Sequence, residues 1–262
     1  MLTADDLTAA EQQVVRAVAR GQAVDLRVGD AAADEPSRGA SWPPERTIRA
    51  DLVARLLMDT DARSPVRLAG ARIAGSLDLE GVTLGRWLLL TDCWLDEPVV
   101  LAHATAPLIG MTGCHVPGLD AENVCIHADL TLDHGFTARG EVKLARARVG
   151  GVLSLAGARL DNPDATALDA GRLTADHHTR MDARFTARGE VRLTGAQISG
   201  DLVLTDARLI NPGGVALAAS QLHVAQSMTA DGLRAEGSIH LTGAETGGSL
   251  TLTGAGLAQD GD

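Results

Sequence analysis

Residues 140–160 read GEVKLARARVGGVLSLAGARL, and two further copies of this block follow in the chain. The second copy, GEVRLTGAQISGDLVLTDARL, begins at Gly189, and the third, GSIHLTGAETGGSLTLTGAGL, begins at Gly237. The heptapeptide FTARGEV, at 136–142 and again at 185–191, overlaps the start of the first two copies. The blocks start 48 to 49 residues apart, a spacing within the range of repeat architectures. The sequence therefore predicts a repeat protein.

A finer period lies inside each block, because an apolar centre recurs about every five or six residues, with an apolar or small residue two positions before it. The first centres are Leu68, Ile73, Leu79, Leu84, Leu90, Leu95, Leu101, Ala106, Met111, Val116, Ala121, Ile126 and Leu132. Side chains two residues apart lie on the same side of an extended strand. A helix would need apolar residues at i, i+3, i+4 and i+7, which this spacing does not supply. We therefore expect residues 65–257 to be all β.

The residues two before the centres alternate between large and small, as Val66 and Ala71 show, so that two kinds of unit make a compound period of about eleven. One such unit cannot bury its apolar pair alone, whereas stacked coils place each leucine on the leucine one turn away. If four centres make one square turn, the chain forms roughly eight coils and a rod about 40 Å long at a strand spacing of about 4.8 Å.

The motif around several centres resembles the pentapeptide-repeat proteins, which carry a small residue, often alanine, two before a central Leu or Phe. The matching motifs are Ala71-Arg72-Ile73, Ala147-Arg148-Val149, Ala158-Arg159-Leu160, Ala196-Gln197-Ile198 and Ala207-Arg208-Leu209. This resemblance covers about three quarters of the chain and implies a right-handed quadrilateral parallel β-helix. The chain departs from it by six-residue steps, by the eight-residue steps Leu160 to Leu168 and Leu209 to Leu217, and by having few Asp or Asn before the centre.

The predicted organisation is a helical N-terminal cap at 1–62, a β-solenoid at 63–257 and a tail at 258–262. One cap helix is expected at 6–20, with Thr3, Asp5 or Asp6 as its N-cap and Gly21 as its stop. A second helix is expected at 44–58, where Pro43 and Pro44 suit a helix start. Residues 29–41 are rich in Ala, Asp, Gly and Pro, which predicts a mobile surface loop. We expect the two helices to close the first coil, whose strand edges would otherwise be exposed.

The other end of the solenoid has no comparable segment, because only Ala-Gln-Asp-Gly-Asp follows Leu257. The last coil is therefore capped by a partner, capped by a second copy of the chain, or left open by truncation. Of these alternatives we favour self-association, that is, a homodimer through the C-terminal coil.

Composition limits the classes of partner and compartment. The chain carries a net charge of -11, which disfavours direct binding to nucleic acid or anionic lipid. It has no uninterrupted apolar run of about 18 residues and no basic start followed by an apolar stretch, so no membrane insertion and no export are expected. Its three cysteines form no CxxC pair, which fits a reducing cytoplasm.

Six residues are the candidate interaction surface. Trp87 and Trp94 are expected to point outward from neighbouring strands, and exposed tryptophan is enriched at interaction sites; alternatively, Trp42 and the N-terminal segment fold over them. Asp176, His177, His178 and Arg180 belong to the run Asp-His-His-Thr-Arg. We expect this run in a longer excursion between strands, where loops on a rigid scaffold carry binding residues, although a plain polar turn explains it as well.

The cysteines and the remaining histidines do not predict a metal site. Cys93 and Cys114 fall two before a centre and are expected inside, as small apolar residues. Cys125 and His127 flank the inward Ile126 and are expected outside, with His115 and His134 within about one coil. This spacing matches no zinc signature. Because no GxGxxG, GxSxG, HExxH or phosphate loop is present either, no catalytic residue, cofactor or metal is predicted.

These observations favour a non-enzymatic scaffold or protein-interaction module whose protein partner the sequence does not identify. The pentapeptide-repeat resemblance implies an alternative, a DNA-mimicking protein that binds topoisomerases; a continuous acidic stripe would favour it, and scattered arginine would argue against it. The chain also resembles a group of actinobacterial proteins with the same helical start and solenoid, some of which carry the label membrane-associated oxidoreductase. An oxidoreductase is therefore a second alternative, although no residue in the chain indicates redox chemistry.

Overall fold

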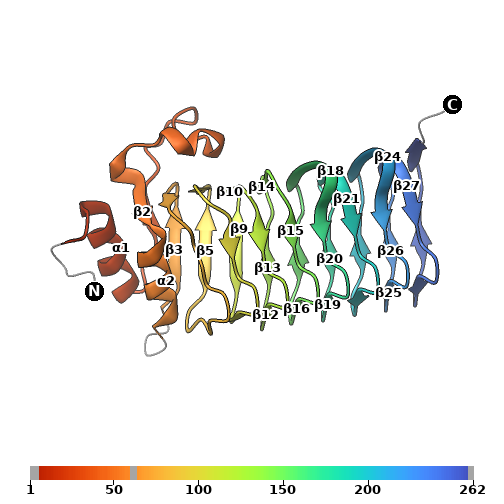
Figure 1. Ribbon diagram of the computed structural model, residues 1–262, viewed down its shortest axis with the longest axis horizontal. Coiled ribbons are helices and arrows are strands. Elements are labelled where there is room, and N and C mark those ends of the chain that lie inside the picture. Colours follow the sequence, from red (N-terminus) through yellow and green to blue (C-terminus); the bar gives the residue numbers. More distant parts are fainter. Residues whose placement is uncertain (1–5, 60–63, 259–262) are drawn as a thin grey trace.

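Each repeat unit forms a short strand, and the strands stack into a parallel β-solenoid of about nine turns behind a small N-terminal cap (Figure 1). The structure is a computed structural model that describes residues 6–59 and 64–258. All strand pairs are parallel, as expected when each coil lies on the previous one. The fold predicted from the repeat is thus confirmed, with about nine turns in place of the expected eight or so.

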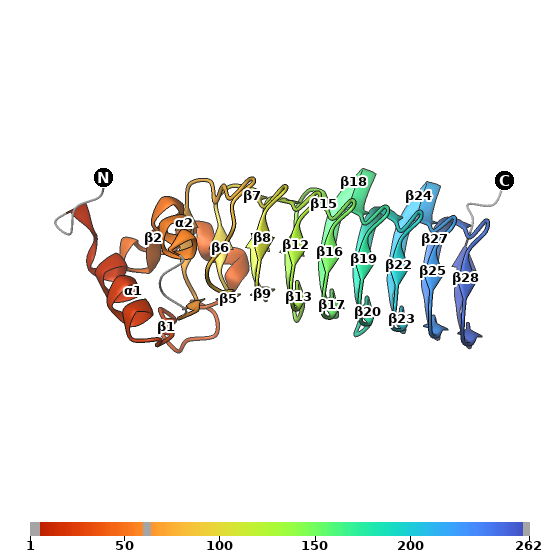
Figure 2. The same cartoon turned by 90° about the horizontal axis from the view of Figure 1, so that it is seen from below.

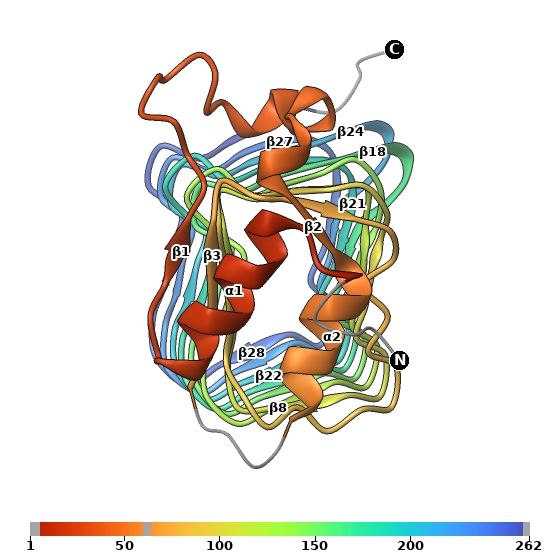
Figure 3. The ribbon, with the colours of Figure 1, turned by 90° about the vertical axis from the view of Figure 1, so that its left-hand side faces the viewer.

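The coil is four-sided in cross-section (Figure 3). Viewed from the N-terminal end, the chain passes clockwise from one sheet to the next while it recedes, so the solenoid is right-handed (Figure 3). Three sheets build the four sides, because the second sheet bends across two of them.

The first sheet contains, in spatial order, β1 (Val24–Asp25), β3 (Val66–Ala69), β5 (Leu88–Thr91), β9 (Ile109–Thr112), β13 (Leu130–Thr131), β17 (Leu153–Ser154), β20 (Thr179–Arg180), β23 (Leu202–Val203), β26 (Met228–Thr229) and β29 (Leu250–Thr251). The main path of the second sheet is β2 (Thr47–Arg49), β4 (Arg72–Ala74), β6 (Trp94–Leu95), β10 (His115–Val116), β14 (Thr137–Ala138), β18 (Arg159–Asp169), β21 (Thr186–Arg192), β24 (Arg208–Ala218), β27 (Arg234–His240) and β30 (Gly256–Ala258). Beside it lie β7 (Val99–Val100), β11 (Leu119–Asp120) and β15 (Val142–Lys143). The third sheet runs β8 (Thr105–Ala106), β12 (Cys125–Ile126), β16 (Arg148–Val149), β19 (Thr174–Ala175), β22 (Gln197–Ile198), β25 (His223–Val224) and β28 (Glu245–Thr246).

The long repeat corresponds to two coils. Val142 pairs with Leu168 in the next coil, and Leu168 pairs with Val191 in the coil after that, so the blocks at Gly140 and Gly189 lie two coils apart. The intervening coil contains the eight-residue step from Leu160 to Leu168, which β18 crosses as one strand with irregular register. β18 and β24, which carry these steps, project from the rod (Figure 2). The two eight-residue steps are therefore bulges at one corner, inserted in coils that lie two apart.

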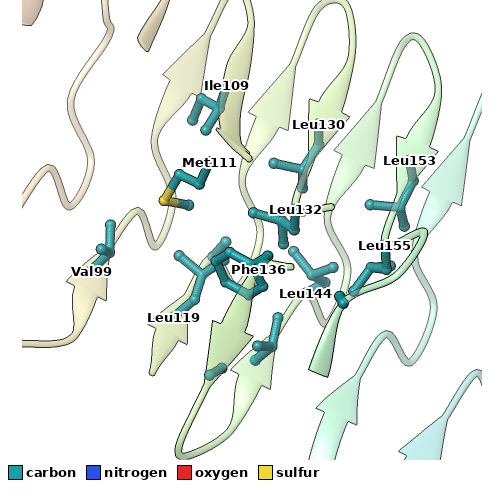
Figure 4. Close-up of a cluster of buried hydrophobic side chains, with 14 of the residues drawn as sticks. Val99, Ile109, Met111, Leu119, Leu130, Leu132, Phe136, Leu144, Leu153 and Leu155 are labelled. Atoms are coloured by element: carbon teal, nitrogen blue, oxygen red, sulfur yellow. The ribbon is translucent and has the colours of Figure 1, made fainter. Parts of the chain in front are cut away.

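The core consists of stacked aliphatic rows that run along the rod (Figure 4). Every centre predicted from Leu68 to Leu132 is buried, and the residues two before them are buried too, except the half-buried Val82. Phe136 and Phe185 occupy the same slot two coils apart and are both fully buried. Each layer thus presents the same few side chains to the next, which is why the aromatic content is only 2%.

The first cap helix is shorter than predicted. α1 (Ala9–Ala19) begins after Thr8, whose hydroxyl accepts from the Glu11 amide while the Glu11 carboxylate accepts from the Thr8 amide. This capping box supplies partners for two N-terminal amides, so Asp6 is not the cap; Thr3 and Asp5 lie outside the described residues. Gly21 ends the helix as predicted, with a φ of 68° that glycine adopts without strain.

The predicted second helix is also wrong over its first half. Its residues divide into the 3₁₀ turn η3 (Pro44–Arg46), strand β2 and the helix α2 (Ala50–Met58). β2 is extended because it pairs with β4 at the start of the second sheet, and β1 pairs with β3 in the same way in the first. The cap therefore supplies edge strands to two sheets as well as helices. α1 and α2 lie across the first coil (Figure 3), as predicted, and their apolar faces join the same core.

The predicted loop at 29–41 is wrong over its second half, which forms the 3₁₀ helix η2 (Pro36–Ser41). Glu35 caps η2 through the Ser37 amide, and a proline occupies its first position, both of which favour a helical start. Gly39 lies so close to the Trp94 side chain that any larger residue would collide with it. This segment is thus packed on β6.

Candidate interaction surfaces

The last coil leaves apolar side chains exposed. Leu241, Leu250, Leu252 and Leu257 are 37%, 46%, 48% and 64% exposed. The residues stacked beneath two of them, one coil earlier, are covered: Met228 below Leu250 is 7% exposed, and Ala235 below Leu257 is 1% exposed. These four leucines, called the open end below, are core positions with no further coil on them in the described part of the chain.

The open end also presents strand edges. In residues 64–258, β28, β29 and β30 are the terminal strands of the three sheets, and each pairs with one neighbour only. Their outer amide and carbonyl groups therefore form a template for another strand. Apolar side chains and unpaired strand edges together favour protein association at this surface.

The two tryptophans of the candidate surface lie on different sides of the coil. Trp87 precedes β5 in the first sheet and is 45% exposed. Trp94 begins β6 in the second sheet, where η2 covers one side of the ring, and its Nε1 donates to Asp96 Oδ1 at 2.9 Å. The ring of His115 lies 6.2 Å from the Trp94 ring. Trp94 thus anchors the cap, and the two tryptophans do not form one surface.

The run from Asp176 to Arg180 is not in a longer excursion. It forms the corner between β19 and β20 and enters β20, whereas the longer links lie in β18 and β24. Asp176 and His177 are exposed, His178 Nδ1 accepts from the Asp201 amide at 3.0 Å, and Arg180 Nη2 donates to Asp182 at 2.6 Å. Asp176, His177 and Arg180 are thus exposed at this corner, and Arg180 is paired to Asp182.

The cysteines divide as predicted. Cys93 and Cys114 are fully buried in adjacent coils, and burial raises the pKa of the Cys114 thiol well above its ordinary value. Cys125 is half-buried and His127 exposed on the outer side of β12. Burial also lowers the pKa of His115. Among residues 6–59 and 64–258, no three His, Cys, Asp or Glu side chains are grouped in a way that could hold a metal ion.

Charges alternate along one side of the rod. The outward residues of β11, β15, β18 and β21 run in register as Asp120, Lys143, Asp169 and Arg192. Lys143 Nζ lies 3.8 Å from Asp120, and Arg192 Nη1 lies 3.3 Å from Asp169. Basic residues therefore interrupt the carboxylates on this side, and no continuous acidic stripe runs along it.

An arginine row lies on the neighbouring side of the second sheet. The outward residues of β14, β18, β21, β24 and β27 are, in register, Thr137, Arg159, Thr186, Arg208 and Arg234. This row was not predicted from the sequence. Its signal was present in the repeated motifs Ala158-Arg159-Leu160 and Ala207-Arg208-Leu209, whose middle residues must point outward from the same side two coils apart.

Comparisons of the chain with protein-family models, with curated proteins and with solved structures gave no match. In residues 6–59 and 64–258, no helix is long and apolar enough to cross a bilayer. The pentapeptide-repeat relationship therefore stays a resemblance in sequence pattern and architecture.

Proposed function

We propose that this protein is a non-enzymatic scaffold that binds other proteins, and that its open end docks a second copy of the chain. The observation that supports the proposal is the exposure of Leu241, Leu250, Leu252 and Leu257 at positions that are core in earlier coils. A contiguous apolar patch bordered by strand edges is typical of a protein interface.

A second copy suits this end because it presents the matching surface. A cover for the open end must present apolar side chains to the aliphatic rows, as α1 and α2 do at the first coil. A second copy carries the same aliphatic rows because its sequence is the same. A two-fold axis between the copies would place the same patch of each chain in the interface. Under that axis the terminal strands of the two chains would run antiparallel, an arrangement that allows regular pairing.

The two alternative functions receive less support. A DNA mimic needs closely spaced carboxylates that imitate duplex phosphates. Although the net charge is acidic, Lys143 and Arg192 neutralise the carboxylates on one side of the rod, and an arginine row occupies the next. For an oxidoreductase, no residue described above supports a redox step.

Light scattering after size-exclusion chromatography tests the proposal on the wild-type chain and on Leu252→Glu. Leu252 is already 48% exposed, so the charge would be tolerated in a monomer but would be buried, and therefore costly, in a dimer. We expect a dimer for the wild type and a monomer for the variant.

The matched control is Val203→Glu, which adds the same charge on the outward side of β23, away from the open end. It should remain a dimer. A wild-type monomer, or equal dissociation of both variants, would reject docking of a second copy at the open end.

A further inference from the structure

The arginine row forms one wall of a groove on the outside of the solenoid. The groove has a volume of about 550 Å³ and is lined by Arg159, Arg184, Thr186, Asp206, Arg208, Gly232 and Arg234. Its four arginines come from four successive coils and are all exposed. We call this feature the arginine groove.

The guanidinium groups of the arginine groove are unpaired. Within residues 6–59 and 64–258, the guanidinium groups of Arg159, Arg184, Arg208 and Arg234 form no hydrogen bond or ion pair. By contrast, Arg72 binds Asp96 on the same sheet nearer the cap, and Arg192 binds Asp169 and Glu190 on the neighbouring side. Four like charges share the groove with one carboxylate, that of Asp206, which forms no ion pair with them among the described residues. The excess positive charge is repulsive, and an anionic ligand would relieve that repulsion.

Arg184 adds a second, independent observation. Its φ is 67°, in the left-handed region that disfavours side chains, whereas the equivalent position of the other FTARGEV copy is Gly135, with a φ of 96°. Glycine would form this corner without strain, although other non-glycine corner residues, among them Ala183 and Asp206, have a positive φ too. Arg184 thus adopts a strained backbone conformation, and its side chain lines the arginine groove.

We propose that the arginine groove binds an extended acidic segment of a partner protein. This inference rests on the proposed role as a protein-binding scaffold and names a second surface for it. Arginine matches carboxylate geometry through paired N–H donors. The partner segment would therefore contribute Asp or Glu side chains that replace the missing counter-charges.

The spacing of the arginines fits a peptide that runs along the rod. Arg159 and Arg234 are three strand spacings apart in the register of the second sheet, about 14 Å at about 4.8 Å per strand. In an extended peptide, side chains on one side recur about every 6.6 Å, so residues i, i+2 and i+4 span about 13 Å. Three alternate carboxylates can therefore reach the ends and the middle of the groove at once.

Two features favour a peptide over a dense polyanion. Asp206 lies in the arginine groove and would repel closely spaced phosphates, whereas a peptide can face it with an amide or hydroxyl donor. The chain as a whole also carries a charge of -11, which repels a nucleic acid with one charge per phosphate more strongly than a segment with three carboxylates.

Fluorescence anisotropy with a labelled, N-acetylated Glu-Ser-Glu-Ser-Glu peptide tests the proposal on the full chain at low ionic strength. We expect binding that weakens as salt rises, because exposed ion pairs are screened, and no binding of the matching Gln-Ser-Gln-Ser-Gln peptide. The double variant Arg208→Glu/Arg234→Glu should lower the affinity at least tenfold.

The matched control is Arg148→Glu/Arg172→Glu, which makes the same change of charge at two exposed arginines of a separate groove, on the side of the third sheet. It should lower the affinity less than threefold. Arg184→Gly, which removes one charge and the left-handed strain, should weaken binding without lowering the melting temperature. Equal losses in the two double variants, or an unchanged affinity in Arg184→Gly, would overturn the assignment.

Competition with inorganic tripolyphosphate identifies the ligand class. The proposal predicts that the peptide binds more tightly; tighter binding of tripolyphosphate would overturn it in favour of a phosphate ligand.

The same titration on Leu252→Glu separates this inference from the proposed docking at the open end. If the wild type is monomeric but binds the peptide, the arginine groove is supported and docking at the open end is rejected. If the wild type is a dimer but does not bind the peptide, docking is supported and the groove is rejected.

Discussion

Thr179 illustrates how a single residue can interrupt an otherwise regular row. It replaces leucine in the inward row of the first sheet, between Leu153 and Leu202. Its side chain is 1% exposed, and its buried hydroxyl has no hydrogen-bond partner among the described residues. From the sequence alone, this run reads as a polar excursion, because a lone Thr among His and Arg conceals the inward position.

The first prediction follows from that hydroxyl. Thr179→Val keeps the shape of the side chain and removes a buried polar group without a partner, which should stabilise the protein by about 1 kcal/mol. The melting temperature should rise by about 2–4 °C, as measured by circular dichroism. Thr131→Val, on the outward side of β13 in the same sheet, is the control and should change it little. An equal or lower melting temperature for Thr179→Val would contradict this account.

At the scale of elements, one ion pair joins the cap to the solenoid. Glu11 in α1 is fully buried and accepts from the backbone amide and the guanidinium of Arg49 at the end of β2, with its Oε1 2.7 Å from Arg49 Nε. The hydrogen bonds from Arg49 lower the pKa of Glu11 from 4.5 to about 2. α1 is thereby tied to the strand that begins the second sheet.

This ion pair predicts a pH dependence. Because the folded pKa is lowered, the stabilisation is complete above pH 4.5 and is lost as the pH falls towards 2. It amounts to at most about 3.5 kcal/mol, from about 1.4 kcal/mol per pKa unit. Glu11→Gln should therefore destabilise the protein at pH 7 and flatten its acid unfolding curve, followed by tryptophan fluorescence. The exposed Glu45→Gln is the control; a wild-type curve no steeper than that of Glu11→Gln would contradict the assignment.

The cap shows where prediction from sequence reaches its limit. The existence of two helices followed from their apolar stripes, but the start of α1 depended on the Thr8–Glu11 capping box, which a choice among Thr3, Asp5 and Asp6 overlooked. β2 was assigned to a helix because Pro43 and Pro44 suggested a helix start before it, although the β-branched Thr47 and Ile48 favour a strand. Pairing with β4, a tertiary contact that no local pattern contains, makes it extended.

At the scale of the whole molecule, most inward residues were predictable because apolar centres recur at steps of five or six residues, and the bulges interrupt this period only locally. The interaction surfaces were less predictable, since outward residues do not have to be apolar at fixed spacings. Trp87 and Trp94 are close in sequence, yet a corner places them on different sheets. Conversely, Arg159, Arg208 and Arg234 are far apart in sequence, yet the coil period aligns them.

Small-angle X-ray scattering of the wild type and of Leu252→Glu tests the central claim, docking of a second copy at the open end, most directly. End-to-end pairing of two rods predicts a wild-type maximum dimension about twice that of the variant, with the same cross-sectional radius. A single maximum dimension for both, or a wild type that differs from the variant in cross-section and not in length, would contradict it.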